Sequence, residues 1–323
     1  MDNKNVFVAI ALSMAVLLFW GAFFETPRQV KENQSIDKVQ TNQNEIQGNI
    51  TPSINQETVI KKISRDDALT EVDRVIIENE KVKGSISLKG AIFDDLSFKN
   101  YKKDLKSGEN VIFLNPKEIE DGYYIESGWT SIGNEVEVPG VDSLWQVKGN
   151  RVLSEKNNVV LEWNNGKGLI FKKTIKLDDK YLFKIKQEVQ NNTSTKINLY
   201  PYAQITRNKK PDDVMGFYIL HEGFIGVFDG ELKEDDYDDI EEKKAVRNSD
   251  NGWLGITDKY WVTAIVPPKD KNFKSTFLYK DNFRANYILN SPVAIKPKST
   301  SDNEVRLFVA AKEVETVDGY AES

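Results

Sequence analysis

Residues 169–189 read LIFKKTIKLDDKYLFKIKQEV and decide the fold class. Every second residue of the first half falls on one face, namely Leu169, Phe171, Lys173, Ile175 and Leu177. The second half repeats this pattern with Tyr181, Phe183, Ile185, Gln187 and Val189. A period of two is typical of a strand with one buried face, and the intervening Asp178, Asp179 and Lys180 suit a hairpin loop. We therefore predict two antiparallel strands here.

The same alternation extends on both sides of this hairpin. It recurs at residues 82–88, and residues 191–195 predict a turn into a third strand at 197–205, which would give a long meander. Further candidate strands are 72–77, 92–98, 111–114, 123–126, 159–163, 224–228, 253–257, 260–266, 276–279, 286–289 and 305–311. No long helical pattern follows Phe24. We predict an all-β body over residues 71–311, built as one extended antiparallel sandwich that folds independently of the membrane.

Composition excludes several classes of function. The chain has 323 residues with 44 Lys plus Arg against 50 Asp plus Glu, so the net charge of −6 offers no basic field for nucleic acid. The absence of cysteine excludes disulfides, thiolate nucleophiles and Cys-ligated metals. A catalytic triad would have to use the single histidine, His221. We assign no catalytic, cofactor-binding or metal-binding residue and predict that the chain is not an enzyme.

The N-terminus predicts a membrane anchor, residues 1–24. Residues 6–24 carry no charge, and at about 1.5 Å per residue they form a helix of about 28 Å, close to the thickness of a bilayer. Trp20, Phe23 and Phe24 lie at the far end, where aromatic rings favour the membrane boundary. A cleaved signal peptide is the alternative, but this boundary lacks small residues. The short N-terminus favours export of the body to the periplasm, although three Asn-x-Ser/Thr triplets would also fit a glycosylated ectodomain.

A polar linker is expected between the anchor and the body, at residues 25–70. Residues 29–56 contain eleven Asn or Gln, and no aromatic residue lies between Glu25 and Phe93. Such a segment buries too little apolar surface to offset its ordering entropy. We predict a disordered tether.

Three features of the body have a functional and a structural interpretation. Residues 231–244 hold eight carboxylates without the regular spacing of a calcium loop, so we interpret them as a solvated loop. His221, beside Glu222, is interpreted as a hydrogen-bonded structural residue rather than a general base. The tryptophans suit core packing, although aromatic platforms beside carboxylates could bind a sugar or an extended peptide.

A series of phrases, taken together, resembles the N-terminal part of the YidC membrane protein insertases of Gram-negative bacteria. They are residues 1–20, 90–91 (GA), 95–96 (DL), 99–101 (KNY), 168–174 (GLIFKKT), 199–202 (LYPY), 226–227 (GV) and 251–261 (NGWLGITDKYW). The last phrase is the most specific. The resemblance covers the whole chain in the same order, although the tether matches only in composition.

The resemblance implies an inner-membrane insertase or chaperone whose periplasmic β-supersandwich is related to galactose mutarotase-like domains. Its partners would be the lipid bilayer, nascent inner-membrane proteins and the Sec translocon, and no cofactor is implied. The family's further membrane domain is missing, so residues 312–323 are interpreted as the start of a segment leading toward it. Trp253, Tyr260 and Trp261 are candidate partner contacts, with core packing as the alternative. The rival functions are a periplasmic carbohydrate-binding protein and a single-span scaffold.

Overall fold

The computed structural model describes residues 60–104, 106, 108–131, 136–212 and 221–312. The predicted anchor, with Trp20, Phe23 and Phe24, lies outside these residues, as do most of the predicted linker and residues 313–323. Within the described ranges no helix is both long and apolar enough to cross a membrane.

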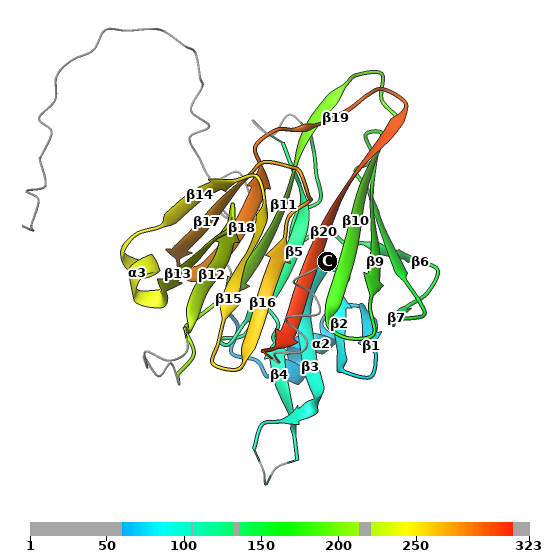
Figure 1. The fold of residues 1–323 in the computed structure, drawn as a ribbon. Coiled ribbons are helices and arrows are strands. Elements are labelled where there is room, and N and C mark those ends of the chain that lie inside the picture. The colour runs from blue at the N-terminus through cyan, green and yellow to red at the C-terminus, as the bar shows by residue number, and fades with distance from the viewer. Residues whose placement is uncertain (1–59, 105, 107, 132–135, 213–220, 313–323) are drawn as a thin grey trace, which may run out of the picture. The chain divides into compact units, whose positions relative to one another are not determined.

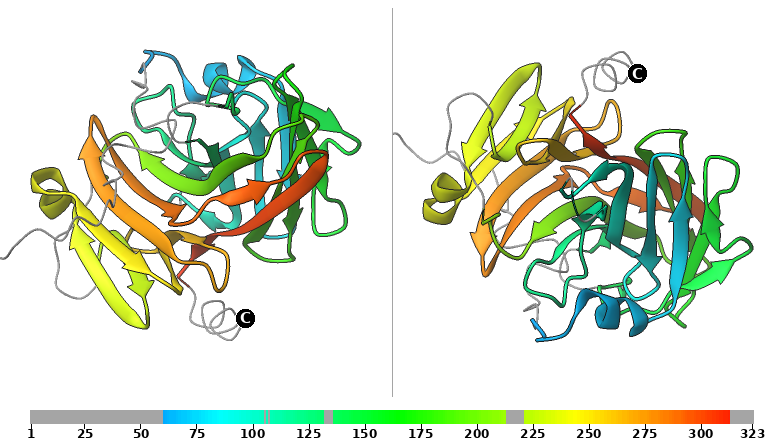
Figure 2. Two further views of the ribbon diagram at one scale, coloured as in Figure 1. Left: turned by 90° about the horizontal axis from the view of Figure 1, so that it is seen from above. Right: turned by 90° about the horizontal axis from the view of Figure 1, so that it is seen from below.

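Two β-sheets stacked face to face make up the body (Figure 1; seen end-on in Figure 2). The larger, 11-stranded sheet contains β14 (Ala245–Ser249), β17 (Phe273–Lys280), β18 (Asn282–Leu289), β11 (Ile197–Arg207), β5 (Tyr123–Thr130), β3 (Ile92–Lys102), β2 (Val82–Ser87), β1 (Arg74–Glu78) and β7 (Val152–Leu153), with β19 (Val293–Ile295) beside β11 and β4 (Asn110–Leu114) beside β3. The 9-stranded sheet contains β13 (Glu231–Asp236), β12 (Gly223–Phe228), β15 (Gly252–Thr257), β16 (Trp261–Val266), β20 (Ser299–Ala311), β10 (Leu182–Asn191), β9 (Leu169–Leu177), β8 (Val159–Asn164) and β6 (Gln146–Lys148). The prediction of a large antiparallel β-supersandwich is confirmed, with a short parallel pairing of β1 and β7 as the exception.

The hairpin that decided the fold class forms as predicted. Strands β9 and β10 pair antiparallel, with Ile175 opposite Ile185. The Asp178 side chain closes the loop, because its Oδ1 accepts the amide hydrogens of Lys180 and Leu182, each at 2.9 Å. In β9 every second residue is buried, which matches the face expected from the alternation.

The predicted meander does not continue beyond β10. Strand β11 belongs to the other sheet and pairs with β5 and β18. The turn at Asn191 carries the chain across, since the Asn191 amide donates to the carbonyls of Thr195 and Ile295 at 2.8 and 3.2 Å. The alternation identifies the buried face of a strand but not its partner strand, so this part of the prediction is wrong.

The core lies between the sheets and is rich in aromatic side chains. Phe93 and Phe183 meet edge to face across it, with ring centroids 5.4 Å apart. Trp129 and Trp145 are buried, as the packing interpretation of the tryptophans requires. Strands β5 and β18 are buried on both faces, which explains why their sequences alternate poorly.

The acidic stretch is structured, contrary to the predicted loop. Residues Glu231–Asp236 form strand β13, which pairs with β12, and Tyr237–Glu242 form helix α3. Tyr237 and Ile240 are buried, and the Tyr237 ring lies 4.8 Å from that of Phe283. Tyr237 and Ile240 therefore anchor the segment, and Asp235 forms a part-buried ion pair with Arg247, while most of the other charges face solvent.

Part of the predicted linker also belongs to the folded body. Helix α2 (Arg65–Thr70) begins after Ser64, whose hydroxyl oxygen accepts the Asp67 amide at 3.1 Å as an N-cap. The amide of Lys61 donates to the carbonyl of Glu118 at 2.6 Å. The sequence places the start of the body at residue 71, and the structure has ordered contacts about ten residues earlier.

Candidate functional site

The three candidate contact residues lie on one hairpin but at opposite ends of it. Trp253 is half-buried near the start of β15, opposite Val227 of β12. Tyr260 and Trp261 lie at the turn that joins β15 to β16. The structure therefore brings two of the three residues together and separates Trp253 from them.

Trp261 and its neighbour Tyr260 have different environments. The Trp261 ring stacks on Phe98 with centroids 4.8 Å apart and planes at 15°, and it meets Tyr101 edge-on at 5.0 Å. The packing alternative therefore holds for Trp261. Tyr260 is 57% exposed, and the Lys259 ammonium lies 5.0 Å from its ring centroid. Tyr260 is therefore an exposed aromatic residue of this turn.

A part-buried ion pair fixes the turn to the larger sheet. Arg207 Nη1, at the end of β11, donates to Asp258 Oδ1 at 2.6 Å and to the Tyr237 hydroxyl at 3.3 Å. Its guanidinium lies 4.7 Å from the centroid of the Tyr123 ring. Burial lowers the pKa of Arg207, whereas Tyr237 and Asp258 raise it, and the balance lies above the ordinary value. Arg207 therefore stays charged and holds the two sheets together at this end.

A cleft of about 460 Å³ opens beside the turn. Residues of β4 form one wall, and Asp258–Trp261 with the segment after β11 form the other. The charged lining residues are Lys103, Asp121, Arg207, Lys209, Lys210, Asp212, Glu222, Asp258 and Lys259. Among the described strands, β4 pairs only with β3. The cleft thus combines mixed charge, an exposed tyrosine and a strand with one partner.

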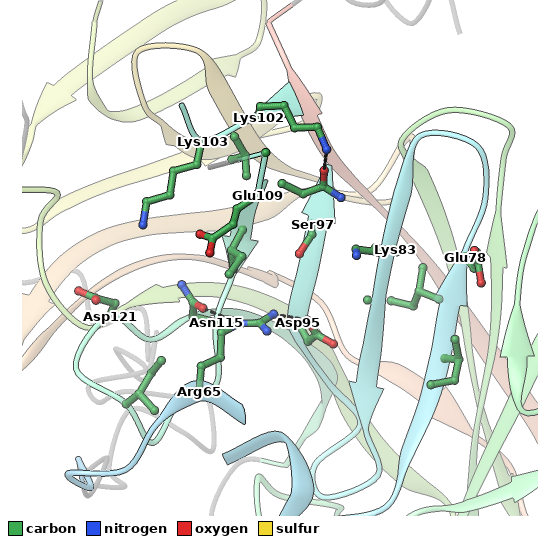
Figure 3. Close-up of a pocket in the computed structure, with 18 of the residues that line it drawn as sticks. Arg65, Glu78, Lys83, Asp95, Ser97, Lys102, Lys103, Glu109, Asn115 and Asp121 are labelled. Carbon is green, nitrogen blue, oxygen red and sulfur yellow. Dashed lines mark hydrogen bonds and ion pairs between the residues drawn. The ribbon is translucent and has the colours of Figure 1, made fainter. Parts of the chain in front are cut away.

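A second, larger cleft of about 1350 Å³ shares part of β4 with the first (Figure 3). Arg65 lies between Asn115 and Asp95 in Figure 3; its Nε donates to Asn115 Oδ1 at 3.0 Å, and it forms an ion pair with Asp95. Ile76 and Ile112 line it and are each about half exposed. Basic, acidic and aliphatic side chains all line its walls.

His221 has a carboxylate neighbour that sequence reasoning did not anticipate. Its Nδ1 lies 3.4 Å from Asp236 Oδ1, and its Nε2 lies 2.8 Å from the carbonyl oxygen of Phe224. His221 is not among the lining residues of either cleft. The second contact satisfies the ring as a structural hydrogen-bonding group, which is the interpretation made from the sequence.

The last described residue also lies at this end of the body. The Lys312 amide donates to the carbonyl of Tyr260 at 2.9 Å, next to the pairing of Trp261 with Ala311. Burial lowers the pKa of Lys312. The structure joins Tyr260 of the turn to Lys312, the last residue that it describes. The sequence analysis did not identify Arg207, because no motif links a residue of β11 to Asp258 of the turn.

Comparisons with known proteins identify relatives of the chain. The family model for the YidC periplasmic domain matches residues 74–323. A membrane protein insertase YidC of Pelagibacter ubique is 45% identical, with 100% of this chain and 57% of that protein covered. Another, of Cereibacter sphaeroides, is 34% identical, with 99% and 53% covered. Among solved structures, a galactose mutarotase related enzyme of Lactobacillus acidophilus is 10% identical, with a TM-score of 0.49. The match covers 74% of this chain and 97% of the chain of that enzyme.

The two stacked sheets define a β-supersandwich protein. The chain belongs to the family of YidC membrane protein insertases, so the resemblance drawn from its sequence is confirmed. It spans about half the length of the curated relatives that it matches.

Proposed function

We propose that this chain provides the N-terminal anchor and periplasmic body of an inner-membrane insertase that assists insertion and folding of inner-membrane proteins, alone or with the Sec translocon. The family match over residues 74–323, together with relatives similar along the whole chain, is the observation that carries this proposal. In this arrangement residues 1–24 span the bacterial inner membrane, residues 25 to about 59 are a linker, and the β-body lies in the periplasm.

The proposed role of the body is non-catalytic. It offers a contact surface at the turn that carries Tyr260, beside the cleft bounded by β4. Two observations support a contact surface at this end of the body. Tyr260 is exposed, and Lys312 is hydrogen-bonded to it, so the chain continues from this surface. A partner held near that continuation would be within reach of the turn.

A chimera tests the insertase proposal. Residues 1–323 would replace the matching part of the Pelagibacter ubique relative, and the chimera would be expressed in cells depleted of their own insertase. We expect restored growth and restored insertion of a reporter membrane protein. A chimera that reaches the membrane, is stably folded and restores neither would contradict the proposal. The unaltered relative, expressed at the same level, is the control.

Site-specific photo-crosslinking in the same chimera tests the contact surface. A crosslinker at Tyr260 should capture a membrane protein or a Sec component. The matched control is Leu144, which is 66% exposed and bridges to Lys89 at the other end of β3. Capture at Leu144 but not at Tyr260 would show that the contact surface lies elsewhere on the body.

A further inference from the structure

A layer of polar side chains crosses the middle of the apolar core. In the smaller sheet, Lys173, Gln187 and Asn303 are direct neighbours on β9, β10 and β20. All three point into the sandwich and are at most 7% exposed. Three polar residues in register on the buried face of adjacent strands are unusual, because each polar group must find a partner away from water.

The larger sheet presents a matching row. Ser275, Tyr287, Ala203 and Ser127 are neighbours on β17, β18, β11 and β5, and all are buried. At one end of the layer, Lys173 Nζ donates to the carbonyl oxygen of Ser127 at 2.7 Å. Gln187, between Lys173 and Asn303 in its row, is fully buried in the same layer.

Several polar atoms of this layer have no hydrogen-bond partner. Within the described residues they are both amide atoms of Gln187, Asn303 Nδ2, the Tyr287 hydroxyl and Ser275 Oγ. Each unpaired buried polar group destabilises a fold, so a cluster of them needs compensation. Lys173 adds an ammonium group with three donors, of which the Ser127 carbonyl uses one.

We propose that this layer is a built-in site for ordered water, centred on the Gln187 amide. Water supplies both donors and acceptors, as the unpartnered amide and hydroxyl groups require. A buried water typically makes about three hydrogen bonds, and a site with several convergent polar groups holds it well.

The layer gives the core a function beyond apolar packing. A hydrated polar row satisfies its groups in one arrangement of the two sheets. Lys173 of β9 spans the sandwich to the Ser127 carbonyl of β5. The water site adds further hydrogen bonds to this link between the sheets.

Two measurements on the full chain test the proposal. A crystal structure of the chain in detergent should show ordered water within hydrogen-bonding distance of the Gln187 amide and Lys173 Nζ. A dry layer, with Gln187, Asn303 and Tyr287 bonded directly to one another, would overturn the proposal. An anomalous peak at the same place after bromide soaking would also overturn it, because the layer would then be an anion site.

The substitution Gln187→Leu should change stability in opposite directions in the two cases. If water is bound to the Gln187 amide, leucine leaves that water without a hydrogen-bond partner, and the unfolding equilibrium constant should rise at least tenfold. If the layer is dry, Leu removes two unpaired groups, and the variant should be as stable as the parent or more stable. Gln190→Leu, at an exposed position of the same strand, is the control and should change little.

Discussion

Lys173 is a charged residue in a place where charges are disfavoured. Burial lowers its pKa to about 8, with Glu126 opposing the shift. The folded state therefore releases this proton before the unfolded state does, and between about pH 8 and 10.5 the unfolded state binds more protons. Stability should rise with pH across this window, by up to about 3 kcal/mol for a shift of this size.

Chemical denaturation at several pH values checks this expectation. In Lys173→Met the rise between pH 8 and 10.5 should be absent, because the titrating group is gone. Lys184→Met, at an exposed position on the neighbouring strand, should keep the rise. An equal slope in the parent and in Lys173→Met would show that other groups cause it.

For the buried Asp94 carboxyl we expect the opposite dependence of folding stability on pH. Burial raises its pKa to about 6, although Arg74 forms an ion pair with it and opposes the shift. The folded state holds this proton more tightly, so stability should fall as pH rises from about 4 to about 6. Asp94→Asn should flatten the fall in denaturation measured across that window, whereas Asp302→Asn, at an exposed residue, should not. A fall of the same size in Asp94→Asn would exclude Asp94 as its cause.

At the scale of single residues, the sequence predicts faces better than partners. The alternation placed Gln187 on the buried face, and the structure agrees. It could not indicate that Asn303 of β20 flanks Gln187, because a period of two does not give the order of the strands. Tyr260 and Trp261 became candidate contact residues because they belong to the family phrase at residues 251–261. Arg207 belongs to no such phrase, and the alternation does not show that β11 lies near the turn.

Two glycines of the phrase at residues 251–261, Gly252 and Gly255, lie where neighbouring strands approach closely. A Cβ at Gly255 would lie 2.1 Å from the carbonyl oxygen of Thr263 on the paired strand. At Gly252, where φ is +132°, a Cβ would lie 1.8 Å from the carbonyl oxygen of Val227. These positions require glycine because neighbouring backbones approach too closely for any side chain.

The substitution Gly255→Ala tests this close approach. The added methyl group must push β15 away from β16, and we expect a loss of more than about 2 kcal/mol in the free energy of unfolding. Gly140→Ala is the control, because nothing lies within 4 Å of a Cβ there. Thermal unfolding of both variants checks the expectation. Equal melting temperatures for the two would mean that the hairpin relaxes at little cost.

Among the elements, edge and terminal segments were the least predictable. The carboxylates of residues 231–244 suggested a solvated loop, but Tyr237 and Ile240 anchor it as strand and helix. Helix α2 went unpredicted because six residues are too short for a visible helical period. In both cases one or two tertiary contacts determine the local structure, and a sequence pattern does not reveal them.

For the whole molecule, the all-β class follows from composition and period, whereas the division into two sheets does not. Neighbouring strands in the sequence part at β10 and β11, and β20 returns from the C-terminal side to pair with β10. Such long-range pairings depend on the complete set of buried faces. The family resemblance supplied the supersandwich that the alternation alone left as one extended sandwich.

The start of the independently folding body can be tested by truncation. A chain of residues 60–312 keeps the Lys61–Glu118 backbone bond, helix α2 and the pairing of Arg65 with Asp95. A chain of residues 71–312, starting at the predicted boundary, loses all three and leaves the half-buried Asp95 without its cation. Both should be soluble with β-type circular dichroism, since the sheets are intact in each, but the shorter chain should unfold at lower denaturant concentration.

Arg65→Met in the longer chain separates the two causes of that difference. If the ion pair accounts for most of it, this variant should unfold close to the midpoint of the shorter chain, because removing one partner of a part-buried pair leaves the other charge unsatisfied. If α2 matters mainly by covering apolar surface, the variant should stay near the parent. Equal denaturation midpoints for both truncated chains would place the start of the stably folded body at residue 71, as the sequence alone suggested.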